Sequence, residues 1–382
     1  MEFSGRTWTE RHRTLNMIAD LLALLSRTAV TPTRFRAIAC FFASVLSSML
    51  MCGSMSAQMP GSDRAEEVGY RNEHDGTRLS AFLTLPPGGG PHPGVLVLSI
   101  AGTTPLVEQL VRDGYAVLIP ERRGFVAVEP MLRATFSDLA NDVRAAIAFM
   151  DSHPEIDGAT IGVVAQADDT PPAMLASVAS DGTMPLVLLA PSALSGVEVF
   201  RREQRWAAER NGVRPDDLEA LDEYVQRIAE TVLNESQVYL RRYRLESVRA
   251  ASTVELPRNA AFPSGERQMD FFASPLWHDR LAFEPEAVFR RLRAPVLVMI
   301  GADDANTPMD EYLGAVRRAL SASASPDATV CRIPGRTRHV FTDAGVTGVT
   351  DWLGARLGSS GPVGTGAGVP LAGCLEDSAE GR

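Results

Sequence analysis

Short apolar runs alternate along the chain with segments whose apolar residues recur at helical spacing. Continuous runs such as GVLVLSI and PVLVMIG are typical of strands that are covered on both faces of a sheet. The expected strands are 77–85, 94–100, 116–120, 160–164, 186–190, 295–301 and 329–333, and the clearest helices are 104–113, 135–152 and 345–357. Buried strands joined by crossover helices predict an α/β fold with a mostly parallel sheet.

The segment 192–291 breaks this alternation. It is highly charged, has helical periodicity and contains no buried strand run. A segment of roughly 100 residues is too long for a simple connection, so we interpret it as a helical lid inserted into one domain at 65–357. A lid over the carboxyl ends of parallel strands would lie where such sheets bind ligands. The alternative is a helical excursion without a function.

The first 57 residues predict a targeting segment. Arg34 and Arg36 precede an apolar run at 37–52, and small residues follow at 53–57, which is the order found in a secretory signal peptide. Because many residues precede Arg34, the true start could lie downstream of Met1. We expect export to the periplasm or the medium, with an uncleaved membrane anchor as the alternative.

The C-terminal segment 358–382 differs from the body in composition. It is rich in Gly, Ser, Pro and Ala, and such a segment predicts disorder because it buries little apolar surface. In an oxidising compartment Cys331 could pair with Cys374 of this tail.

Composition and charge exclude several kinds of chemistry. The 382-residue chain has a net charge of −10, which argues against nucleic acid and anionic membranes as main partners. A membrane contact is expected only through an uncleaved N-terminal segment. All 37 cationic side chains are Arg, so mechanisms that need a Lys amine are absent. The 6 His and 4 Cys lack zinc-ligand spacing, and we expect neither a metal nor an organic cofactor.

Five segments of the chain carry a family resemblance. They are DGTRLSAFLTLPPGGGPHPGVLVL (75–98), PERRG (120–124), ATFSDLANDVRAAIAFMDSHPEID (134–157), SPLWHDRLAFEPEAVFRRLRAPVLVMIGADDANTP (274–308) and IPGRTRHVF (333–341). In this order they resemble the α/β-hydrolase family, most of all exported bacterial hydrolases related to dienelactone hydrolase and to prolyl-oligopeptidase-type peptidases. The resemblance covers roughly 67–357. It implies an α/β-hydrolase fold and acyl transfer by a Ser, an Asp and a His in that chain order.

Two members of that triad have matching positions in this sequence. Asp304 follows the expected strand 295–301, with Asp303 as the alternative acid, and His339 follows the expected strand 329–333. The resemblance implies that Asp304 orients His339 and that His339 is the general base.

The third member is missing. The family's nucleophile turn, G-x-S-x-G, corresponds here to residues 165–169, which read AQADD. Ala167 therefore stands at the nucleophile position and has no nucleophilic atom, and both flanking glycines are replaced. Three differences together indicate natural drift rather than a single laboratory substitution.

The loop that would bind an oxyanion has also changed. The family's H-G-x-G corresponds to Ser99 followed by Ile100, Ala101 and Gly102. Oxyanion donors are backbone N–H groups, so this loop and the N–H of Asp168 could still form part of the hole. The Asp168 carboxylate would oppose a developing negative charge by about 4 kcal/mol, at ~4 Å and an effective dielectric near ~20.

These observations leave three hypotheses about function. The first is a catalytically impaired homologue that binds a small acyl, ester or peptide-like ligand or a partner. The second is an active hydrolase in which Asp168 attacks, or in which His339 activates water, with Thr103 or Thr104 as weaker candidates. The third is a protein-interaction domain without a pocket. The sequence specifies neither the ligand nor the oligomeric state.

Overall fold

The computed structural model describes residues 65–98, 104–124, 128–180, 184–252, 266–302, 309–334 and 343–358, together with Cys374. These residues belong to one compact unit, Asp63–Arg382. The expected targeting segment 1–57 and nearly all of the expected disordered tail lie outside the described residues.

An eight-stranded sheet forms the centre of this unit. Its strands are β1 (Ala65–Arg71), β2 (Arg78–Thr84), β3 (His92–Leu98), β4 (Ala116–Pro120), β5 (Ile156–Gln166), β6 (Leu186–Leu189), β7 (Val296–Gly301) and β8 (Ala328–Ile333). The spatial order is β1-β2-β4-β3-β5-β6-β7-β8. The β1–β2 and β2–β4 pairs are antiparallel and the other pairs are parallel. This mostly parallel order is that of the α/β-hydrolase fold, as the resemblance implied.

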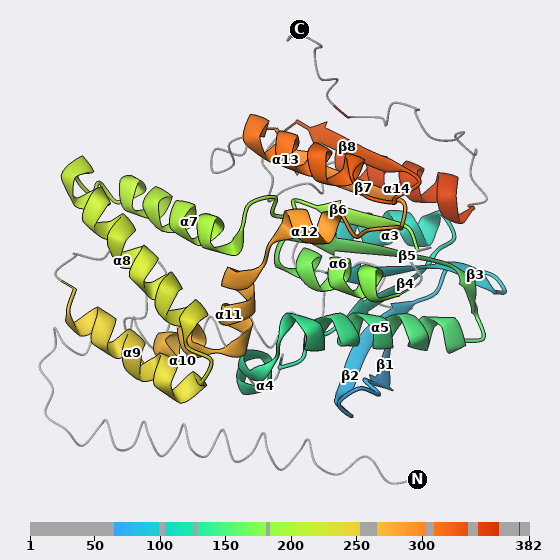
Figure 1. The fold of residues 1–382 in the computed structure, drawn as a ribbon. Helices are drawn as coiled ribbons and strands as arrows, with labels where there is room; N and C mark the ends of the chain where they lie inside the picture. The colour runs from blue at the N-terminus through green and yellow to red at the C-terminus, as the bar shows by residue number, and fades with distance from the viewer. Residues whose placement is uncertain are drawn as a thin grey trace, which may run out of the picture. The chain divides into compact units, whose positions relative to one another are not determined.

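Helices cover both faces of the sheet (Figure 1). They are α3 (Thr104–Arg112), α5 (Phe136–Ser152), α6 (Thr170–Ala179), α13 (Met309–Ser321) and α14 (Asp343–Leu357). Two shorter helices pack on other helices: α4 (Val128–Arg133) on α11 (Pro275–Ala282), and α12 (Pro285–Phe289) on α6 and α13. The helix α3 packs against α14, and α5 packs against α6. Gly162 of β5 permits one close contact, because a Cβ there would stand 3.0 Å from Leu357 of α14. The strands β3, β4, β6 and β7 are buried almost throughout, as are residues 161–165 of β5, which explains their continuous apolar runs.

Side-chain hydrogen bonds define the start of α5. Thr135 caps α5: its hydroxyl accepts the N–H of Asp138, and the Asp138 carboxylate accepts the N–H of Thr135 in return. The carboxylate of Asp279, from another part of the chain, accepts the N–H of Phe136 at 2.8 Å. Two carboxylates therefore satisfy N–H groups at this helix terminus, where negative charge is favourable.

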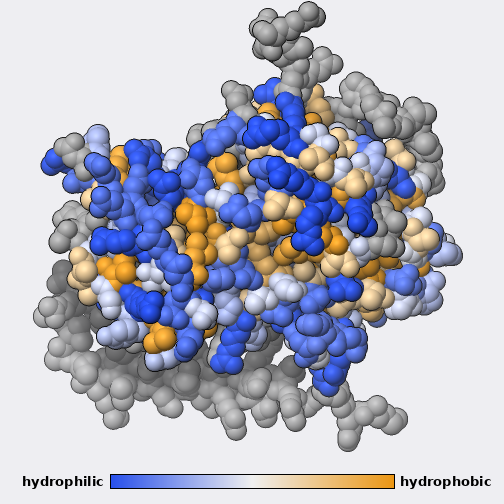
Figure 2. Space-filling view, in the orientation of Figure 1, coloured by the Kyte–Doolittle hydropathy of each residue, from blue (hydrophilic) through white to orange (hydrophobic). Residues whose placement is uncertain are grey.

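The insertion between β6 and β7 is helical wherever it is described. It consists of α7 (Gly196–Arg210), α8 (Pro215–Asn234), α9 (Val238–Ala250), α10 (Glu266–Ala273) and α11 (Pro275–Ala282), which we call the helical insertion. Its buried side chains form a hydrophobic core separate from that of the sheet. Trp277 is central to this core, with ring centroids 5.3 Å from Phe200 and 4.7 Å from Phe272. Figure 2 shows hydrophilic side chains over much of the insertion and hydrophobic ones gathered where it meets the sheet domain.

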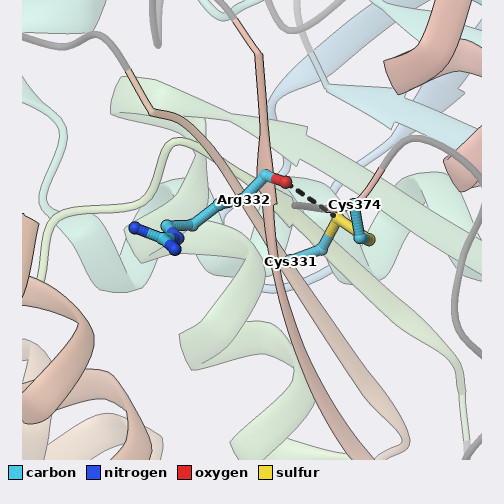
Figure 3. Close-up of a disulfide and its surroundings, with 3 residues drawn as sticks. All are labelled: Cys331, Arg332 and Cys374. Carbon is cyan, nitrogen blue, oxygen red and sulfur yellow. Dashed lines mark hydrogen bonds between the residues drawn. A yellow bond between two sulfur atoms is a disulfide. The ribbon is translucent and has the colours of Figure 1, made fainter. Parts of the chain in front are cut away.

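A disulfide joins β8 to the C-terminal segment (Figure 3). Cys331 is buried in β8, and its sulfur is bonded to that of Cys374, with 5.3 Å between the two Cα atoms. The pairing that the sequence left open is therefore present. Among the helices that the structure describes, none combines the length and the apolar character that crossing a membrane requires.

Candidate functional site

The candidate site begins where β5 ends at the carboxyl edge of the sheet. Residues 161–165 of β5 are buried, and the chain leaves the strand at Gln166 into a short turn before α6. We call residues 166–170 the elbow turn. The carboxyl ends of β5, β6, β7 and β8 lie side by side, because Gln166 pairs with Leu189 and Gly301 pairs with Ile333.

Ala167 has an unusual backbone conformation in the elbow turn. Its φ is +49°, and Ala190, after β6, is the other described non-glycine residue with positive φ. The left-handed region costs an L-residue roughly 1–2 kcal/mol. Thr170 offsets part of this cost, because its N–H and its hydroxyl both donate to the Ala167 carbonyl oxygen, the hydroxyl at 2.7 Å. The Ala167 side chain is exposed and consists of a single methyl group, so it cannot form an acyl intermediate.

Asp168, the next residue, is paired with the helical insertion. Its carboxylate lies 3.0 Å from the guanidinium of Arg280 on α11, and 65% of the Asp168 side chain is exposed. Arg280 also stacks over the ring of Trp277, 5.4 Å from its centroid. Arg280 therefore places a positive charge beside the carboxylate that we expect to repel a developing oxyanion.

Asp169 is paired on the opposite side, with the sheet domain. Its partner is Arg122, which follows β4 in the PERRG segment. Burial raises the pKa of Asp169, as does the nearby Asp168 carboxylate, and Arg122 offsets only part of this rise. Burial alone would lower the pKa of Arg122, but the two carboxylates raise it above its ordinary value. The elbow turn thus carries two adjacent carboxylates, each held by a different Arg.

A partly buried ion-pair network lies beside Arg122. The next residue, Arg123, donates to Asp142 of α5 from its Nε at 2.6 Å and to Asp75 of the β1–β2 turn at 2.9 Å. Asn72 donates to the same Asp142 carboxylate at 2.7 Å. Consecutive arginines therefore join the loop after β4 to the elbow turn in one direction and to α5 and the β1–β2 turn in the other.

Several sequence-predicted residues fall outside the described parts of the chain. These are the acid Asp304 and its alternative Asp303, the base His339, and the oxyanion-loop residues Ile100, Ala101 and Gly102. The strands that lead to them, β7, β8 and β3, all have their carboxyl ends at the edge where the elbow turn lies. Within the described residues, no group of three or more His, Cys, Asp or Glu side chains is arranged to hold a metal ion.

Sequence reasoning missed the roles of Arg122 and Arg280. Both stand in segments that carry the family resemblance, PERRG and SPLWHDRLAF, but nothing in those letters identifies their partners. Arg280 is 112 residues from Asp168 in the sequence, so only the folded chain brings the two together.

Comparison with known proteins finds similarity among solved structures. No protein-family model matches the chain, and no curated protein matches it significantly. Similar solved structures include the 2,6-dihydroxy-pseudo-oxynicotine hydrolase, with 16% identity, a TM-score of 0.49, and coverage of 80% of this chain and 72% of the other. A Klebsiella pneumoniae protein assigned as a dienelactone hydrolase has 12% identity, a TM-score of 0.44, and coverage of 77% and 98%.

An acylaminoacyl peptidase of Pyrococcus horikoshii is also similar, with 12% identity, a TM-score of 0.48, and coverage of 81% of this chain and 43% of the peptidase. Esterases are among the other matches. Likeness at these identities concerns the fold alone, and the fold assignment made above rests on the strand order of the sheet.

Proposed function

We propose that this chain is an impaired member of the acyl hydrolases, which binds an ester-like or peptide-like ligand at the elbow turn without forming an acyl intermediate. The observation that carries the proposal is the +49° φ of Ala167 between β5 and α6. A sharp strand-to-helix turn is the setting of the nucleophile in this fold. Here the costly backbone conformation is kept while the reactive side chain is absent.

Asp168 is a weaker nucleophile candidate than the sequence alone suggested. It follows the residue with positive φ rather than occupying that position, and Arg280 holds its carboxylate at 3.0 Å. A carboxylate that is paired with a guanidinium is a poorer nucleophile, because attack requires breaking the ion pair. In the proposed site Asp304 and His339 are a residual acid and base, and the second candidate activity is His339 acting on a water molecule.

We also propose that the chain is exported before it functions. The order of basic, apolar and small residues in the first 57 residues supports this location. The bond between Cys331 and Cys374 supports it independently, because stable disulfides belong mainly to oxidising compartments. Pulse labelling in the source organism would test export. Mature protein in the periplasm or medium is expected, and full-length protein retained in the cytosol would contradict it.

A restoration experiment tests the loss of the nucleophile. We would compare hydrolysis of p-nitrophenyl acetate and butyrate by the natural protein, by Ala167→Ser, and by Ala165→Gly combined with Ala167→Ser. The matched control is Ala190→Ser, which adds the same hydroxyl at the other described non-glycine residue with positive φ. We expect activity above background only in the two Ala167→Ser variants.

The outcome separates the candidate activities. If the natural protein hydrolyses either ester and loses that activity on His339→Ala, the proposal is wrong, and the attacking group is either a water molecule activated by His339 or Asp168. If Asp168→Asn abolishes the natural protein's activity while Ala190→Ser leaves it unchanged, Asp168 is the nucleophile. If Ala190→Ser gains as much activity as Ala167→Ser, position 167 is not the nucleophile position.

A further inference from the structure

The ion pair between Asp168 and Arg280 crosses a boundary between two parts of the fold. Asp168 belongs to the elbow turn of the sheet domain, and Arg280 belongs to α11 of the helical insertion. The two parts have separate hydrophobic cores, so polar contacts of this kind contribute to holding one against the other. The contact also adjoins Ala167, the residue at which we propose that a ligand binds.

Arg280 has a second carboxylate within reach. Glu203 of α7 lies 3.6 Å from the other terminal nitrogen of the same guanidinium. Unlike Asp168, Glu203 belongs to the helical insertion itself. The backbones of α7 and α11 are held close together at Gly196, where a Cβ would stand only 1.8 Å from the carbonyl oxygen of Arg280. Glu203 and Arg280 therefore remain neighbours when the contact with the elbow turn is broken.

In the structure Arg280 contacts both carboxylates at once, one with each terminal nitrogen of its guanidinium. Its side chain is 31% exposed, and those of Asp168 and Glu203 are 65% and 41% exposed, so water and ions reach all three. The residue beside Arg280 is tied to the sheet domain independently, because the carboxylate of Asp279 accepts the N–H of Phe136 at 2.8 Å. Loss of the Asp168 contact by Arg280 thus needs a side-chain movement but no displacement of α11.

We propose that Arg280 is a two-position clasp between the helical insertion and the elbow turn. Paired with Asp168, it ties the insertion to the turn, and paired with Glu203 alone, it leaves that tie open. Glu203 lowers the cost of opening, because the guanidinium keeps an ionic partner in both positions. The clasp stands on the described contacts alone, whereas its effect on a ligand beside Ala167 rests on the proposed function.

Hydrogen–deuterium exchange of the full-length protein tests the clasp without any ligand. The readout is the exchange rate of peptides covering the elbow turn and α11. Asp168→Asn and Arg280→Gln each remove the tie, and we expect exchange to rise by about two- to fivefold, as is reasonable for an exposed pair. The matched control is Arg205→Gln, which removes a pair with Asp222 at 2.6 Å that lies wholly within the insertion. It should leave both peptides unchanged.

Glu203→Gln distinguishes a clasp from a static network. With Glu203 neutralised, Asp168 is the one carboxylate among the described residues that still pairs with Arg280, so exchange should fall below that of the natural protein. Raising sodium chloride from 0.05 M to about 1 M should speed exchange in the natural protein and not in Arg280→Gln, because salt screens exposed pairs.

The proposal is overturned if Glu203→Gln raises exchange as Asp168→Asn does, since Arg280 would then need both carboxylates at once. It is also overturned if Arg280→Gln behaves like the Arg205→Gln control. These results would leave the proposed function untouched, because that proposal is tested by ester hydrolysis at position 167 and not by exchange.

Discussion

Replacement of Arg123 by Ala should destabilise the fold more than loss of any exposed Arg. The Arg123 side chain is 9% exposed, and its carboxylate partners Asp142 and Asp75 are 15% and 28% exposed. Removing one partner of a fully buried ion pair costs about 3–5 kcal/mol, whereas an exposed pair contributes less than about 1 kcal/mol. Because the contacts of Arg123 with Asp142 are partly buried and its contact with Asp75 is exposed, we expect a loss between these limits, about 2 kcal/mol.

Urea unfolding followed by circular dichroism would measure this loss, and a thermal scan should show a fall in Tm of roughly 4 °C. The control is Arg112→Ala, because Arg112 is 61% exposed and lies 3.8 Å from Glu108 on the same helix. Loss of such a pair should cost less than about 0.5 kcal/mol. A double variant, Arg123→Ala with Asp142→Ala, should lose less than the sum of the single losses. If Arg123→Ala lowers the free energy of unfolding no more than Arg112→Ala does, the partly buried network does not stabilise the fold as described. The same follows if the loss in the double variant equals the sum of the losses in Arg123→Ala and Asp142→Ala.

Three further predictions follow from described contacts. Burial alone would raise the pKa of Asp75, but hydrogen bonds from Thr77 and the guanidinium of Arg123 hold the pKa below its usual value. The ionised Asp75 therefore adds to the free energy of unfolding above pH ~4, and this contribution is lost as the pH falls through the lowered pKa. The free energy of unfolding should thus fall less steeply with acid in Arg123→Ala than in the natural protein. Removing the disulfide by Cys374→Ser should lower the free energy of unfolding by up to about 4 kcal/mol, from the entropy of closing a loop with a sequence separation of 43; an unchanged Tm would contradict this. Trp277→Ala should cost about 3–5 kcal/mol because the ring is 4% exposed, and a urea midpoint within error of the natural protein's would refute the packing described for the helical insertion.

The alternation of strands and helices could be predicted from the sequence, because buried parallel strands have continuous apolar runs. Strand β4 occupies the expected residues, and β3 and β7 differ from expectation by two residues or fewer at each end. Strand β1 was missed as a separate element. It is an edge strand with the sequence AEEVGYR and no fully buried residue, so it resembles an exposed segment. The hydrogen bonds that pair β1 with β2 form only in the folded sheet, so hydrophobic periodicity in the sequence does not predict them.

The candidate site could be predicted only where it depends on chain order. The sequence places residue 167 in the turn after the expected strand 160–164. The structure adds its positive φ, which residue preferences do not predict for Ala. The charge balance could not be predicted, because Asp168 and Asp169 read as two uncompensated carboxylates. Their partners Arg280 and Arg122 come from α11 and from the loop after β4, and only the folded sheet brings them to the same turn.

The most direct test of the central claim is covalent labelling with a fluorophosphonate, which reacts with an activated serine. The natural protein and Ala167→Ser would be treated alike, digested, and mapped by mass spectrometry. We predict no adduct on the natural protein and one adduct on the variant at residue 167, because the proposed function rests on a turn that keeps its positive φ at Ala167 and has no nucleophilic side chain there. An adduct on the natural protein, at any residue of the body, would contradict the account.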